Sequence, residues 1–152
     1  MGWAPLLAAA LAPVAAAPAG EAVVPYTIVD GRAIPASLTG APGDAERGRA
    51  LYAGDPRTGC PACHGTPGMR RDGPQAAPPA PDLAGIGGRL DAGEIRLWLV
   101  APEVLAESTS MPAYYAAGQR TDAGDPLYGG PRLTAAEIED LVAYLAGLGA
   151  PE

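Results

Sequence analysis

The chain has 152 residues, enough for one domain, and its formal net charge is −7. A protein that binds nucleic acid needs a basic face, so this charge balance argues against that class of partner. Phenylalanine is absent, and 21 glycines and 18 prolines predict long irregular segments around a core with few bulky side chains.

Residues 1–19 have the features of a signal peptide. Residues 3–17 are apolar, rich in alanine and uncharged, which suits the hydrophobic region of an export signal and is short for a membrane span. The small residues Ala17 and Ala19 frame a cleavage site. We therefore expect export with cleavage near Ala19 and no stable membrane span, with an uncleaved anchor as the alternative.

Residues 20–43 form a separate segment, which we call the arm. Its three prolines and many β-branched residues favour an extended chain over a helix. The arm carries more apolar side chains than a solvated linker would: Val23, Val24, Tyr26, Ile28, Val29, Ile34 and Leu38. These side chains should lie either on the chain's own domain or on a partner protein.

The first helix is predicted to begin after Asp44, a good N-cap, and to cover residues 45–53. Gly48 and Tyr52 are four residues apart and therefore share one face of this helix. A glycine inside a helix is tolerable where another helix crosses closely. Gly54-Asp55-Pro56 ends the helix.

The next stretch, Cys60-Pro61-Ala62-Cys63-His64, has the spacing C-x-x-C-H of a c-type haem attachment motif. Two thiols at this spacing can add across the two vinyl groups of one haem. The adjacent His64 can then bind the iron through a neutral imidazole. One covalent haem c would also fill the core volume that the missing bulky side chains leave.

The motif has two other interpretations, a zinc site and a redox dithiol. A zinc site needs about four ligands, but the chain has only these two cysteines and one histidine. A redox dithiol should follow a buried strand and open a long helix, which the Gly- and Pro-rich flanks do not favour.

Two further helices are predicted downstream of the motif, and no stretch alternates as a strand should. Asp91 with Glu94 and Thr134 with Glu137 are capping boxes that mark their first turns. Helical spacing places these apolar side chains toward the core: Ile95, Trp98 and Leu99 in the earlier helix, and Ile138, Leu141, Val142 and Leu145 in the later one. In the loop between the motif and the earlier helix, the Pro81 carbonyl could accept a hydrogen bond from His64, unless Pro81 is simply part of a turn.

The second axial iron ligand is predicted to be Met111. The only histidine is already used, and a thioether is the next common choice in electron-transfer haems. Met69 is the alternative, but it follows His64 so closely that the chain would have to round the haem edge to reach the opposite face. Core filling is the ordinary role for Met111 if it is no ligand.

In order, these features resemble class I cytochrome c over about residues 43–148. The resemblance implies an all-α fold of three or more helices around a covalent haem, with long loops. The cytochrome domain would cover residues 44–150, after the signal peptide and the extended arm. In this family the first and last helices cross at glycine and aromatic residues, the places taken here by Gly48, Tyr52 and Tyr144.

A narrower resemblance is to SoxX, the monohaem subunit of the SoxAX cytochrome complex of sulfur oxidation. It rests on residues 34–40 of the arm, Gly43-Asp44-Ala45, Gly48-Arg49, the segment from Pro81 to Arg89, and Met111-Pro112. It implies Cys60 and Cys63 as covalent haem attachments, His64 and Met111 as axial ligands, and no catalytic residue in this chain.

The SoxX resemblance also implies partners and a periplasmic location. The chain would form a heterodimer with a SoxA-like haem subunit, in a complex that oxidatively couples thiosulfate to a cysteine of a SoxYZ-like carrier. It would pass the released electrons to a soluble acceptor. We expect the arm to dock on the SoxA-like subunit and not to complete the core of its own domain. The alternatives are a free periplasmic cytochrome c of a respiratory chain, which needs no arm, and a haem sensor with an exchangeable sixth site.

Overall fold

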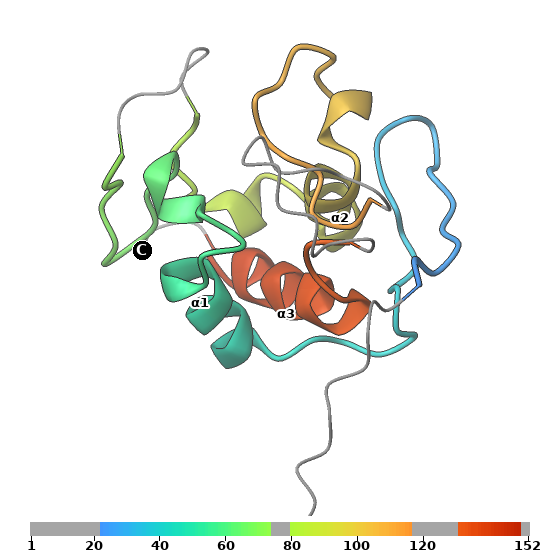
Figure 1. Ribbon diagram of the computed structural model, residues 1–152, viewed down its shortest axis with the longest axis horizontal. Helices are drawn as coiled ribbons and strands as arrows, with labels where there is room; N and C mark the ends of the chain where they lie inside the picture. Colours follow the sequence, from blue (N-terminus) through green and yellow to red (C-terminus); the bar gives the residue numbers. More distant parts are fainter. Residues whose placement is uncertain (1–21, 74–79, 117–130, 150–152) are drawn as a thin grey trace, which may run out of the picture.

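A computed structural model of the chain describes residues 22–73, 80–116 and 131–149 (Figure 1). The elements are the α-helices α1 (Ala45–Gly54), α2 (Ala92–Val100) and α3 (Ala135–Ala146), and the single 3-10 turns η1 (Cys60–Ala62), η2 (Ile86–Gly88) and η3 (Pro102–Val104). The described residues contain two isolated β-bridges and no strand, which confirms the all-helical fold. No helix among them is long and apolar enough to cross a membrane. The predicted signal peptide lies outside the described residues.

Each α-helix begins where its capping residue predicts. The Asp44 carboxylate accepts hydrogen bonds from two amides of the first turn of α1. Asp91 and Thr134 form complete capping boxes at the starts of α2 and α3. These caps satisfy amides that have no partner inside the helix, so short sequence signals suffice to place the helix starts.

Helices α1 and α3 lie across each other (Figure 1), and Gly48 is at their contact. A Cβ atom on Gly48 would overlap the Asp140 carbonyl oxygen and press on the Cβ of Tyr144. Beside this contact the rings of Tyr52 and Tyr144 lie 5.6 Å apart between centroids, tilted by 55°. The predicted crossing at a glycine with flanking aromatic residues is therefore confirmed.

Helix α2 is buried on more sides than its periodicity predicts. Ile95 and Leu99 are in the core as expected, but Leu97 is also fully buried. Trp98, expected in the core, is only half-buried and lies outside the core cluster. Helix α2 packs on α3 and is also contacted by the arm, so a single apolar stripe does not describe its buried surface. Burial of Trp98 against the haem stays a prediction.

The arm completes the core of this domain, contrary to the expectation that a partner alone would cover it. Ile34 is fully buried and Leu38 is 7% exposed, and both belong to the core cluster. The Ile34 amide donates to the carbonyl of Gly93 at the start of α2 (3.0 Å). An extended segment cannot satisfy its own backbone groups, and here the helices of the same chain supply the partners.

A buried ion pair holds the arm to both helices. Arg96 of α2 and Glu139 of α3 are 4% and 2% exposed, and two hydrogen bonds of 2.7 and 2.8 Å join them. Arg96 also donates to the Ile34 carbonyl (2.6 Å), and Glu139 accepts from the Leu38 amide (2.9 Å). The pair thus satisfies polar groups of the arm that would otherwise be buried without partners.

Candidate haem site

The Cys60–His64 motif forms one tight turn. Gly59 enters it in the left-handed conformation (φ 59°), and η1 then occupies Cys60–Ala62. The amides of Cys63 and His64 both donate to the Cys60 carbonyl, at 3.1 and 2.9 Å. The turn follows no strand and opens no long helix, so the geometry does not favour the redox-dithiol interpretation.

The two thiols are both available for covalent attachment, since neither cysteine forms a disulfide. Burial raises the pKa of the Cys60 thiol. Within the described part of the chain, no three His, Cys, Asp or Glu side chains gather where they could hold a metal ion. Among these residues the motif therefore offers two thiols and one imidazole, and no cluster of side chains suitable for binding zinc is found.

The His64 ring is oriented as an iron ligand requires. Its Nδ1 lies 2.8 Å from the Pro81 carbonyl oxygen, which confirms the predicted contact. A carbonyl can only accept, so Nδ1 carries the proton in the neutral ring and Nε2 keeps its lone pair free for a metal. The backbone carbonyl of His64 is held in turn by the Tyr52 hydroxyl at 2.9 Å. This donor set fits a haem iron bound through Nε2.

The loop that presents the Pro81 carbonyl is braced at several points. The Leu83 amide donates to the Gly65 carbonyl at 2.8 Å, which ties the loop to the chain just after the motif. The Arg89 guanidinium donates to the carbonyls of Ala84 and Asp82, at 2.6 and 3.2 Å. These bonds connect the loop to η2 and hold the acceptor of His64 in place.

Sequence reasoning missed one residue beside the motif, Tyr114. Tyr114 is 4% exposed, and its hydroxyl donates to the Thr58 carbonyl at 2.7 Å, two residues before Cys60. Burial, followed by the electrostatic effect of Cys60, raises the pKa of Tyr114. No local pattern could reveal this contact, because 56 residues separate its partners.

The two candidate methionines lie in different settings. Met69 closes a tight turn with Thr66 through reciprocal backbone hydrogen bonds of 2.9 Å, right after the motif. Met111 lies in the loop after η3, and its amide donates to the Thr109 hydroxyl at 3.1 Å. Both are partly buried and pack against the core. A turn so close to His64 leaves Met69 little reach, and Met111 as axial ligand stays a prediction.

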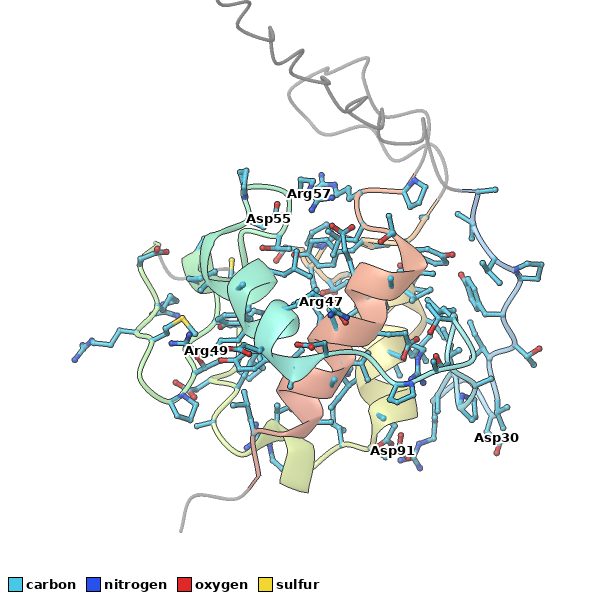
Figure 2. All side chains as sticks on the ribbon, turned by 90° about the horizontal axis from the view of Figure 1, so that it is seen from below. Asp30, Arg47, Arg49, Asp55, Arg57 and Asp91 are labelled. Carbon is cyan, nitrogen blue, oxygen red and sulfur yellow. The ribbon has the colours of Figure 1, made fainter. Side chains whose placement is uncertain are left out.

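A second polar cluster ties the segment before the motif to the start of α3. Arg57 donates to Asp55 and to Glu137, each through a contact of 2.6 Å, and to the Arg132 carbonyl. The hydrogen bonds from Arg57 lower the pKa of Asp55. Burial alone would raise the pKa of Glu137, but the hydrogen bonds from Arg57 and Thr134 outweigh it and lower that pKa too. Figure 2 shows Asp55 and Arg57 together at one end of the molecule.

Acid should weaken this cluster. The ordinary pKa values of Asp55 and Glu137 are 3.8 and 4.5, and the folded chain lowers both. As the pH falls, the two carboxylates therefore take up protons more readily in the unfolded chain than in the folded one. The stabilisation from this cluster is complete at neutral pH, and it is lost as the pH falls through these two values and below them.

Glu137→Gln, which keeps a capping side chain, should cost on the order of 1 kcal/mol at neutral pH. Urea unfolding between about pH 7 and pH 3 should show a smaller acid-induced loss in this variant; an equal loss would contradict the assignment.

Comparison with known proteins agrees with the geometry. The sequence profile of the family described as Cytochrome c matches residues 45–149. A chain of the crystal structure of SoxXA from P. pantotrophus is 33% identical, with a TM-score of 0.69. The alignment covers 85% of the present chain and 98% of that chain. No curated protein matches the sequence.

Proposed function

Because the chain belongs to the cytochrome c family, we propose that it is the monohaem electron-transfer subunit of a SoxAX-like complex. The observation that carries this proposal is the similarity to a SoxXA chain at 33% identity over nearly all of that chain. The complex would oxidatively couple thiosulfate to a cysteine of a SoxYZ-like carrier, with the catalytic site in a SoxA-like subunit. The chain would work in the periplasm after loss of residues 1–19.

The residues of the motif would hold the cofactor. Cys60 and Cys63 would carry the thioether links, His64 would bind the iron through Nε2, and Met111 would supply the second iron ligand. Bound haem supplies a one-electron iron couple. The Pro81 carbonyl keeps the His64 proton on Nδ1 and makes the imidazole a more basic ligand. The basicity of an axial ligand is one of the properties by which a protein sets the reduction potential of a haem iron.

Met111→Gly should leave haem attached to the protein but abolish the weak far-red charge-transfer band that marks sulfur bound to ferric iron. A glycine removes the thioether while the two cysteines and His64 remain. Absorption spectra of the purified oxidised protein measure this directly. Met69→Gly is the matched control and should keep the band. Retention of the band in the Met111 variant, or its loss in the control, would reassign the ligand.

A free periplasmic electron carrier is the second candidate function. The burial of Ile34 and Leu38 favours it, because part of the arm is satisfied without a partner. Co-purification from the native host separates the two functions. A SoxA-like haem subunit recovered in equal amount with the chain supports the proposed function. A monomeric cytochrome at physiological concentration supports the free carrier.

A further inference from the structure

The exposed large apolar side chains of the described residues gather on two segments. They are Val24 (38% exposed), Tyr26 (37%) and Val29 (44%) of the arm and Val104 (44%) of η3. Single exposed apolar residues need no explanation, but a group on adjoining segments points to an interaction site. We call Val24, Tyr26 and Val104 the arm–η3 patch.

The patch is continuous around the buried Tyr115. The Val24 amide donates to the Tyr115 hydroxyl at 2.9 Å. The amide of the next residue back, Tyr114, donates to the Leu99 carbonyl at 2.9 Å, so Tyr115 lies beside the C-terminal end of α2. The turn η3, which carries Val104, follows directly from that end of α2. Residues from two segments that are far apart in sequence thus form one surface.

Val29 lies away from this surface. The arm begins near Tyr115, beyond the C-terminal end of α2, and reaches the N-terminal end of α2, where the Ile34 amide meets Gly93. Figure 2 shows Asp30, the neighbour of Val29, at the same end of the molecule as Asp91, the N-cap of α2. Val29 therefore offers an exposed valine of the same arm outside the patch.

The charges at the patch restrict what can cover it. Glu103, the neighbour of Val104, and Glu107, three residues after Val104, are exposed, and neither forms a salt bridge within the described ranges. An anionic membrane surface would be repelled. In a symmetric dimer through the patch, the Glu103 side chains of the two copies would approach each other, and like charges in an interface are costly. A different protein with basic side chains around an apolar centre fits both features.

We propose that the arm–η3 patch is the docking surface for the SoxA-like haem subunit, and that this subunit presents an apolar centre flanked by lysine or arginine. This inference rests on the proposed function and names the surface that the partner uses. In Figure 1 the arm lies on the side of the molecule away from the turn η1. Docking at the patch therefore leaves the haem-attachment turn uncovered for the exchange of electrons with an acceptor.

Affinity measurements with single substitutions test the surface. The haem-loaded chain is titrated by calorimetry with the SoxA-like haem subunit of the same organism, in its haem-loaded form. Val104→Asp should weaken binding by about tenfold or more, as expected for loss of an apolar contact at the centre of an interface. Glu103→Arg should also weaken binding and reduce its dependence on salt. Val29→Asp, the same chemical change outside the patch, should bind like the wild type.

Each other outcome has a definite meaning. If the wild type binds and Val104→Asp and Glu103→Arg bind equally well, with unchanged haem spectra, the proposed surface is wrong and the proposed function stands. If the wild type does not bind this subunit, both proposals fail. Sedimentation showing a wild-type dimer that Val104→Asp dissociates would assign the patch to a second copy. Flotation with vesicles containing anionic lipid would assign it to a membrane.

Discussion

Replacing Arg96 with leucine should lower the free energy of unfolding by about 3–5 kcal/mol. Glu139 is 2% exposed, and its carboxylate would remain in the interior without its cation. The Ile34 carbonyl would also lose its 2.6 Å partner. Urea unfolding of the haem-loaded protein, followed by circular dichroism, measures the loss.

The double variant Arg96→Leu/Glu139→Leu is the informative control. Removing both charges avoids the isolated buried carboxylate, so much of the lost stability should return. The Leu38 amide would still lack its acceptor, and limited proteolysis should then cut the arm faster than in the wild type. A double variant as unstable as Arg96→Leu would show that the ion pair is not the source of the loss.

Gly48→Ala should lower the free energy of unfolding by about 3 kcal/mol, the upper part of the range for an overpacked core. The added methyl group would overlap the Asp140 carbonyl oxygen. A backbone group inside α3 cannot move aside as a flexible side chain can, so the helices α1 and α3 must separate. Thermal unfolding of the haem-loaded protein is the measurement.

Gly54→Ala provides the matched substitution for Gly48→Ala. Gly54 is the last residue of the same helix, and a Cβ there would meet no atom within 4 Å. The change should be neutral or slightly stabilising, because alanine restricts the unfolded chain. Equal melting temperatures for the two variants would place the close contact elsewhere than at Gly48.

The features that sequence alone determined are those governed by neighbouring residues. A cap is made by residues three apart, as with Thr134 and Glu137, and the predicted haem-attachment motif is a matter of the spacing from Cys60 to His64. The amphipathic period of α3 likewise placed its four predicted apolar side chains in the core. Even the distant crossing of α1 and α3 could be anticipated, since the resemblance to class I cytochrome c assigned Gly48 to it.

The features that only the tertiary structure decided depend on which segment lies opposite a residue. Glu139 and Asp140 are charged and fall outside the apolar face of α3. Both are nevertheless buried, because Arg96 of α2 pairs with Glu139 and Arg47 of α1 pairs with Asp140. The arm could have covered a partner or its own helices, because extended apolar chain has no period that selects a surface. Hydrogen bonds to groups 62 and 101 residues away place the arm on the helices of its own chain. Such contacts contribute free energy only after the helices have assembled, so no local pattern in the chain records them.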